Sequence, residues 1–161
     1  MFDTVLIAGL GLMGGSMAKT IKARTLSRVL GWNRTRATAE QALADGSIDA
    51  IATEALYKEA DLVIIGLYPQ ATVDWLLENM SKMKKGCVIV DMVGVKQFMV
   101  DHLEQAALDA GVHYVGGHPM AGREFSGLDF ALSTLFDGAS MIFVPTKSST
   151  ERVLEQLEAY F

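Results

Sequence analysis

The chain has 161 residues, of which 50% are hydrophobic, and this is enough for one domain with a core of its own. A net charge of -5, without any stripe of lysine or arginine, argues against nucleic acid as a partner. No apolar run approaches the roughly 18 residues of a membrane-spanning helix, and no basic leader precedes the first strand, so we expect a cytoplasmic protein. The single cysteine, Cys87, lies in an apolar run, and we expect it in the core.

Apolar runs alternate with helical patterns from one end of the chain to the other. Strands are expected at residues 5–9, 28–32, 48–52, 62–67, 88–92, 113–115 and 140–144. Helices are expected at residues 13–24, 35–45, 71–80, 96–110, 125–136 and 150–160. The strand runs are continuously apolar, which is typical of strands covered on both faces. This order predicts an α/β fold with a doubly wound, mostly parallel sheet and helices on both faces.

The first strand leads into a glycine-rich turn and then into a helix. Gly9, Gly11 and Gly14 have the G-x-G-x-x-G spacing that is typical of a dinucleotide-binding turn. These glycines permit a tight turn, a close approach of the backbone to the pyrophosphate, and packing of the helix on the strand. The alternative is an ordinary strand–turn–helix built from small residues. We favour a single Rossmann-type dinucleotide-binding domain over residues 1–161, and its expected contacts in this turn are Gly9, Leu10, Gly11, Leu12, Met13 and Gly14.

The residues after the second strand indicate which dinucleotide is bound. Roughly 20 residues beyond the glycines, NAD-binding domains usually place an Asp or Glu on the adenosine ribose. This chain has Asn33, Arg34, Thr35 and Arg36 there, which supply the donors and the positive charge that suit the 2′-phosphate of NADP. We therefore expect these four residues to bind the cofactor, with NADP preferred over NAD. Alternatively, Asn33 or Thr35 only caps the next helix and the arginines are solvated.

The fourth strand is followed by another candidate for the same site. In an open parallel sheet, ligands bind beyond the carboxyl ends of the strands. Leu67, Tyr68 and Pro69 follow the fourth strand, and their backbone could line the ribose or the nicotinamide. The proline could equally do no more than begin a helix.

The segment after the fifth strand combines a small residue with a positive charge. Val93 and Gly94 allow a flat ring to lie close to the backbone, and Lys96 could meet a carboxylate. A lysine at the start of a helix is also often just a surface charge. We include all three residues in the expected site.

A glycine-framed histidine follows the next strand. Glycines on both sides of His118 let the segment approach a ligand, and Pro119 restricts the backbone directly after it. An imidazole suits removal of a hydroxyl proton during hydride transfer, because its ordinary pKa is near 6.5. The other two histidines, His102 on a helix and His113 at a strand start, are expected to be structural.

Three motifs, in this order and spacing, resemble those of one family: Gly9-x-Gly11-x-x-Gly14, Asp91-x-x-Gly94-Val95-Lys96 and Gly117-His118-Pro119-Met120-Ala121-Gly122-x-Glu124-x-Ser126-Gly127. They resemble the nucleotide-binding domain of prephenate and arogenate dehydrogenases. The likeness covers essentially the whole chain. The third motif is much more particular than the glycine turn, which very many dehydrogenases share.

The resemblance implies an activity and roles for single residues. In that family prephenate is oxidised and decarboxylated to 4-hydroxyphenylpyruvate in tyrosine biosynthesis, or arogenate is converted to tyrosine. By resemblance His118 is the partner of the substrate hydroxyl, and Glu124 lies at the mouth of the substrate pocket; no metal is expected. Many members carry Ser or Thr in place of Gly94, and there the hydroxyl orients the histidine and the cofactor.

The resemblance also implies parts that this sequence does not contain. The family normally continues into a helical second domain that supplies an arginine for the substrate carboxylate and most of a homodimer interface. The mean hydropathy of +0.26 agrees with an apolar surface that such a domain would cover. Two alternatives stay open: the cofactor-binding domain of a β-hydroxyacid or imine reductase type of dehydrogenase, and a stand-alone NADP-binding sensor.

Overall fold

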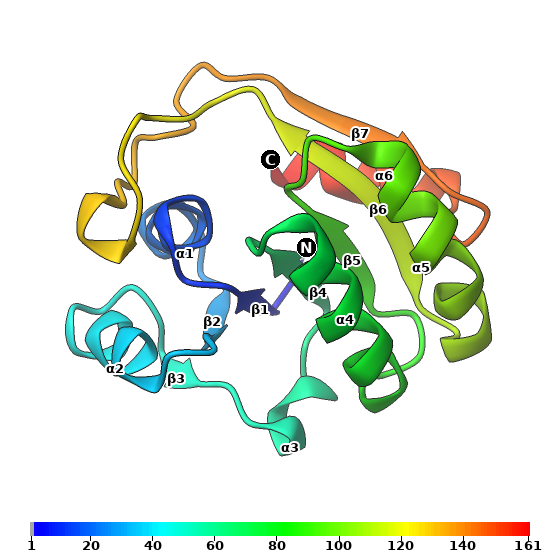
Figure 1. Cartoon of the computed structure of the whole chain (residues 1–161), viewed down its shortest axis with the longest axis horizontal. Coiled ribbons are helices and arrows are strands. Elements are labelled where there is room, and N and C mark those ends of the chain that lie inside the picture. The colour runs from blue at the N-terminus through cyan, green and yellow to red at the C-terminus, as the bar shows by residue number, and fades with distance from the viewer. Residues whose placement is uncertain (1) are drawn as a thin grey trace.

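The computed structural model describes residues 2–161, which form a seven-stranded sheet flanked by helices (Figure 1). The strands are β1 (Thr4–Ala8), β2 (Arg28–Trp32), β3 (Ala50–Ile51), β4 (Leu62–Ile65), β5 (Val88–Asp91), β6 (His113–Pro119) and β7 (Met141–Pro145). Their order across the sheet is β3-β2-β1-β4-β5-β6-β7, and every pair is parallel except β6 with β7. The doubly wound, mostly parallel sheet expected from the sequence is confirmed.

Helices cover both faces of this sheet. They are α1 (Leu12–Arg24), α2 (Arg36–Ala44), α3 (Glu54–Tyr57), α4 (Pro69–Asn79), α5 (Lys96–Ala110) and α6 (Glu151–Tyr160), with 3-10 turns η1 (Met80–Lys82) and η2 (Leu128–Phe130). Buried side chains of α1, α2 and α6 pack in one core cluster with the sheet, and those of α3, α4 and α5 pack in a second. Among residues 2–161, no helix has the length and apolar character needed to cross a membrane.

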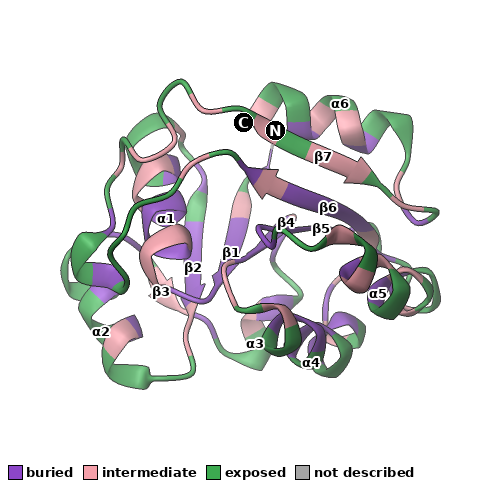
Figure 2. Ribbon diagram, turned by 45° about the horizontal axis from the view of Figure 1, so that its top comes forward, coloured by how far each residue is buried: buried purple, intermediate pink, exposed green. Residues whose placement is uncertain are grey.

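The strand β1 explains why the strand runs are continuously apolar. Val5 and Ile7 pack in the first core cluster, Leu6 and Ala8 pack in the second, and all four are fully buried. Figure 2 shows this burial in the central strands, while exposed positions lie on the outer helices and loops. Cys87 belongs to the second cluster, and burial raises the pKa of its thiol to about 12, which confirms it as a core residue.

The segment between β6 and β7 is not the helix expected at 125–136. It leaves β6, runs beside α1 and returns to β7 (Figure 1), and η2 is its one short helical turn in the described chain. Side chains of α1 bond its backbone: Ser16 Oγ accepts from the Leu132 N–H at 3.0 Å, and Lys19 Nζ donates to the Ala131 carbonyl at 3.2 Å. These tertiary bonds replace those of a helix, and the apolar residues that suggested one, such as Leu128, pack against α1 instead.

Smaller differences from the expected elements also bear on the site. The strand β6 extends to Pro119, because β7 pairs with it in antiparallel register up to Met141. His118 therefore lies within a strand and pairs with Ile142, rather than lying on a loop. The four-residue helix α3 was not expected, and α4 begins at Pro69, two residues before the expected start.

Candidate functional site

The glycine-rich turn joins β1 to α1 at the carboxyl edge of the sheet. A Cβ on Gly14 would lie 1.8 Å from the Gly9 carbonyl oxygen, and Gly9 has a φ of +93°, so both positions require glycine. Gly11 is the N-cap of α1, and the direction of its missing side chain is open space. No side chain caps this helix, so its first N–H groups and the positive end of its dipole can bind an anion.

Asn33, just past β2, connects the two loops at the edge of the sheet. Its Oδ1 accepts from the Leu10 N–H at 3.0 Å, and its Nδ2 donates to the Thr35 carbonyl at 3.1 Å. Leu10 itself is fully buried in the first core cluster. Asn33 therefore fixes the relative position of the glycine turn and the β2 tip, and the Leu10 side chain lies in the core.

The two arginines at the β2 tip are not equivalent. Arg36 opens α2 and pairs with Glu40 at 2.8 Å. Arg34 is exposed and has no ion-pair partner among residues 2–161. Of the positive groups expected to meet a phosphate, Arg34 is thus the one that no carboxylate of the described chain neutralises.

Two cavities meet over the glycine turn. The β2-side cavity, about 510 Å³, is bordered by the glycine turn, the residues after β2 and the first turns of α4. The β5-side cavity, about 420 Å³, is bordered by the start of α1, the residues after β4 and β5, and the segment after β6. Both include Gly11, Gly66, Leu67 and Tyr68, so they lie end to end along the carboxyl edge. A cavity of about 910 Å³ between α1 and α6 contains none of the expected site residues.

Most of the expected cofactor contacts border these two cavities. The β2-side cavity includes Gly9, Gly11, Asn33, Arg34 and Thr35. The β5-side cavity includes Gly11, Leu12, Met13, Pro69, Val93 and Gly94. Leu67 and Tyr68 border both. Leu10, Gly14 and Arg36 border neither, and the role of Gly14 is the close helix–strand contact described above.

His118 differs from the other two histidines in how its ring is bonded. In His102 and His113, Nδ1 lies 2.7 Å and 2.6 Å from a backbone carbonyl oxygen, which agrees with structural roles. The Nδ1 of His118 is buried without a hydrogen-bond partner among residues 2–161. A Cβ on Gly94 would lie 3.4 Å from His118 Cε1 and 3.8 Å from Nδ1, so this ring covers a residue that borders the β5-side cavity.

Lys96 begins α5 and its amine turns back to the ends of two strands. It pairs with the Asp91 carboxylate and donates to the Gly117 carbonyl oxygen at 2.6 Å. Asp91 is fully buried and also accepts from the Val93 N–H at 2.8 Å and the Tyr114 hydroxyl at 2.6 Å. Burial lowers the pKa of Lys96, and the Asp91 charge opposes this shift. In the structure, the carboxylate that pairs with Lys96 is that of Asp91.

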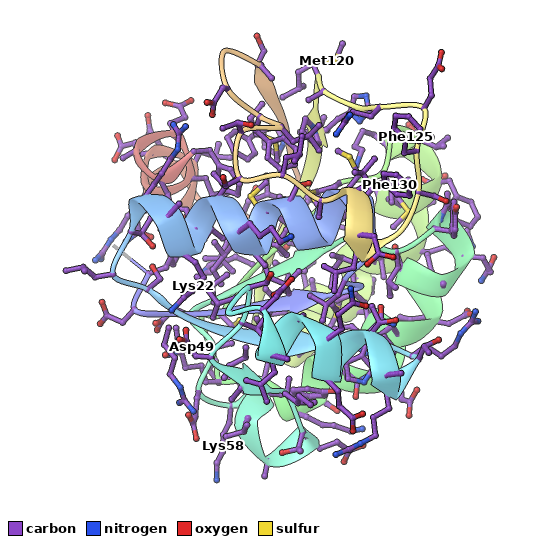
Figure 3. All side chains as sticks on the ribbon, turned by 90° about the vertical axis from the view of Figure 1, so that its left-hand side faces the viewer. Lys22, Asp49, Lys58, Met120, Phe125 and Phe130 are labelled. Atoms are coloured by element: carbon purple, nitrogen blue, oxygen red, sulfur yellow. The ribbon has the colours of Figure 1, made fainter. Side chains whose placement is uncertain are left out.

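The segment after β6 presents exposed apolar side chains beside the β5-side cavity. Met120, Phe125 and Phe130 lie along it (Figure 3), with exposed fractions of 56%, 50% and 42%. The two phenylalanine rings stack with centroids 4.8 Å apart, and the Arg123 guanidinium lies 5.3 Å from the Phe125 centroid. Glu124 is exposed on the same segment and borders neither cavity.

Some residues at the two cavities were not among those expected from the sequence. Trp32 and Trp75 both border the β2-side cavity, and their rings lie 5.5 Å apart between centroids. Trp32 directly precedes Asn33, so its position at the strand tip was a usable signal; Trp75 lies on α4 and gave none. Ser126 and Gly127 border the β5-side cavity, and their place in the third motif was the signal.

Comparisons with known proteins show the family of this chain. Residues 17–161 match the family described as prephenate dehydrogenase, nucleotide-binding domain. Prephenate dehydrogenase of Bacillus subtilis is 38% identical over 98% of this chain and 43% of its own length. The structure of prephenate dehydrogenase from A. aeolicus in complex with hydroxyphenyl propionate and NAD+ is 27% identical, has a TM-score of 0.87, and matches over 99% of this chain and 56% of its own. Synechocystis arogenate dehydrogenase, at 23% identity over 98% of this chain and 55% of its own, has the same fold with a TM-score of 0.87.

These matches cover nearly all of this chain but only part of the relatives. The chain spans about half the length of the curated relatives it matches, at 43%, 45% and 55% of their lengths. The family match starts at residue 17, after the glycine turn, whereas the match to the Bacillus subtilis relative covers 98% of the chain. The alternative of a β-hydroxyacid or imine reductase domain is not favoured. The chain belongs to the family of prephenate dehydrogenase nucleotide-binding domains.

Proposed function

We propose that this chain is the cofactor-binding domain of an enzyme that oxidises and decarboxylates prephenate or arogenate with NAD(P), and that His118 accepts the substrate's hydroxyl proton. The observation that carries the proposal is the buried Nδ1 of His118, which has no partner in the described chain and lies beside Gly94, a residue that borders the cavity adjoining the glycine turn. In His102 and His113 the same nitrogen lies at a backbone carbonyl oxygen, so among the described histidines His118 is the one whose Nδ1 is left without a partner.

The two cavities suit the two ends of a dinucleotide. The adenosine half fits the β2-side cavity, where Trp32 and Trp75 offer aromatic surface and Arg34 a positive charge. The pyrophosphate fits the N-terminus of α1 at Gly11, which both cavities share. The nicotinamide then lies in the β5-side cavity against Val93 and Gly94. This orientation places the reactive ring near His118.

The chemistry requires one hydride acceptor and one proton acceptor. The cofactor supplies the hydride acceptor for the hydrogen on C4 of the substrate ring. As that hydrogen leaves, the C4 hydroxyl gives its proton to His118, the ring carboxylate leaves as carbon dioxide, and the ring becomes aromatic. An imidazole is the side chain most often used for such a proton transfer.

The substrate carboxylates need positive groups that the β5-side cavity does not offer. No lysine or arginine is among the described residues that border it, and Lys96 is committed to Asp91 and Gly117. Arg123 lies on the adjacent segment, over the exposed Phe125 ring. We therefore propose that the remaining substrate contacts come from a second domain, in a homodimer, and that the 161-residue chain alone binds the cofactor but turns over substrate poorly.

Substitution of His118 tests the catalytic part of the proposal. In the complete gene product, we expect His118→Asn to lower kcat for prephenate or arogenate on the order of 10²–10⁴-fold, with cofactor affinity retained. The matched control is His102→Asn, on the exposed side of α5, which should leave turnover within twofold. NAD(P)H absorbance measures both. Unchanged turnover in His118→Asn would refute the role and would favour a dehydrogenase of another type.

The preference for NADP is a separate proposal and rests on Arg34. Because Arg34 is unpaired and Arg36 is paired with Glu40, we expect Arg34→Ala to weaken NADP binding about tenfold, or about 1.4 kcal/mol, and to change NAD binding less than twofold. Arg28→Ala, at the opposite end of β2, is the control. The quenching of Trp32 and Trp75 fluorescence reports Kd for both cofactors, because both tryptophans border the β2-side cavity. Tighter binding of NAD than of NADP by the unchanged chain would contradict the preference.

A further inference from the structure

The strand β6, which carries His118, stops pairing with β5 before the chain reaches His118. The last pair of the β5–β6 ladder is Val90 with Val115. His118 lies three residues after Val115, where β6 no longer pairs with β5. On its other side β6 pairs with β7 through Pro119. On the β5 side, the bond from Lys96 Nζ to the Gly117 carbonyl, at 2.6 Å, continues the connection where the backbone ladder has ended.

The Asp91 carboxylate, which holds the amine of Lys96, is buried and hydrogen-bonded. The Lys96 amine pairs with Asp91, the last residue of β5, whose side chain has an exposed fraction of 0% against 16% for that of Lys96. Asp91 is in turn held by the Val93 N–H and the Tyr114 hydroxyl, and Tyr114 lies on β6 itself. One carboxylate therefore bonds groups from β6, from the loop after β5 and from the start of α5.

Gly116 and Gly117, which precede His118, leave room for Lys96 and the end of β5 to contact β6. A Cβ on Gly116 would lie 2.9 Å from Lys96 Cδ, and a Cβ on Gly117 would lie 2.4 Å from the Asp91 carbonyl oxygen. Any larger residue would therefore push β6 away from Lys96 or from the end of β5. The pair of glycines and the lysine are parts of the same contact.

The ring of His118 depends on this backbone contact because no side chain orients it. Its Nδ1 has no partner in the described chain, and Gly94, the residue beneath it, has no side chain to bond it. We propose that Lys96, anchored by Asp91, is a positioning residue that sets the place of His118 through the Gly117 carbonyl. This inference rests on the proposed function, in which His118 is the proton acceptor; a purely structural Lys96–Asp91 pair is the competing explanation.

The test uses Lys96→Met, which keeps an unbranched side chain one atom shorter and removes the charge. The control is Lys85→Met, because Lys85 also donates to a backbone carbonyl, that of Ala110 at 2.7 Å, at the other end of α5. In the complete gene product, we expect Lys96→Met to lower kcat at least tenfold with KM for the cofactor within twofold, and Lys85→Met to change neither. Equal loss in both variants, or a loss only in KM, would refute positioning.

Imidazole NMR of the cofactor-saturated 161-residue chain gives a readout that does not depend on turnover. The chain has three histidines, so each ring can be followed. We expect Lys96→Met to shift or broaden the ring signals of His118 and to leave those of His102 and His113 in place. Unmoved His118 signals would overturn the inference even where His118→Asn supports the proposed function. If His118→Asn leaves turnover unchanged, the proposed function fails, while the NMR result still decides whether Lys96 holds the ring.

Removing Lys96 alone leaves a buried Asp91 carboxylate without its cation, which could unfold the chain. The double variant Asp91→Asn/Lys96→Met removes both charges, and the amide can still bond Val93 and Tyr114. We expect the double variant to fold and to show the same displaced His118 signals and the same loss in kcat. A folded double variant with normal signals and normal kcat would overturn the proposal.

Discussion

Replacing Gly94 by serine tests directly whether the free nitrogen of His118 is available. A Cβ at position 94 lies 3.8 Å from His118 Nδ1 and 3.4 Å from Cε1, which is ordinary van der Waals contact. A serine hydroxyl on that Cβ can approach Nδ1 to about 2.8 Å, a normal hydrogen-bond distance. Gly94 is not among the glycines with positive φ, so the new side chain brings no backbone strain.

The expected gain can be divided between two effects. Loss of glycine freedom in the unfolded chain stabilises by about 0.4–1 kcal/mol, and Gly94→Ala isolates that part. The hydrogen bond to a buried, otherwise unpartnered nitrogen adds about 0.5–1.5 kcal/mol, and only Gly94→Ser has it. We therefore expect Gly94→Ser to exceed Gly94→Ala by about 1 kcal/mol, or about 2–4 °C in Tm for a chain of this size.

Urea unfolding of the two variants and of the unchanged chain, followed by circular dichroism, measures this difference. Imidazole NMR adds a check, because only Gly94→Ser should move the His118 ring signals. A serine variant no more stable than the alanine variant, with unmoved His118 signals, would mean that Nδ1 is already bonded in solution. The central observation behind the proposed role of His118 would then be wrong.

Three further predictions concern the fold and its core. Gly14→Ala places a Cβ 1.8 Å from the Gly9 carbonyl oxygen, so urea unfolding should show a loss of about 3 kcal/mol or more, and fluorescence titration should show no cofactor binding. Burial raises the pKa of Asp61, but bonds from Lys84 and from two backbone N–H groups outweigh this and hold the pKa below its ordinary value of 3.8. The stability that results is fully present above pH 3.8 and is lost as the pH falls through the pKa of the folded state. Asp61→Asn should therefore flatten the acid dependence of the free energy of unfolding. Cys87, with a thiol pKa of about 12, should resist a thiol reagent at about pH 8 in the folded chain and react in denaturant.

The parts of the fold that the sequence predicted well are those set by local pattern. Continuous apolar runs placed the strands because both faces of the sheet are covered, and β2 and α5 have the expected bounds. The helix predicted at 125–136 was wrong, because backbone groups of this segment bond to Ser16 and Lys19 of α1, more than a hundred residues away. No local pattern records such a contact.

The same distinction separates the two halves of the candidate site. The glycine turn is a contiguous motif whose geometry follows from the size of Gly9, Gly11 and Gly14, so it could be found from spacing alone. The bond from Lys96 to the Gly117 carbonyl could not, because these two residues come together only when β5 and β6 pair. A charged residue beside a motif suggested a ligand contact, whereas its charge is used within the fold.

Under the proposed function, the chemistry of the β5-side cavity bears on the choice of substrate. Its described lining carries no charge, which suits a nicotinamide ring and an aromatising substrate ring but cannot separate a keto acid from an amino acid. Prephenate and arogenate differ only at one side-chain carbon, which carries a keto group in prephenate and an amino group in arogenate. Their discrimination therefore requires polar groups that contact that carbon. If a second domain closes the cavity as proposed, exchanging that domain should change which of the two is oxidised, while exchanging Arg34 should change only the cofactor. The nucleotide-binding domain would thus set the cofactor and the position of the proton acceptor, and leave the choice of substrate to the groups that close the cavity.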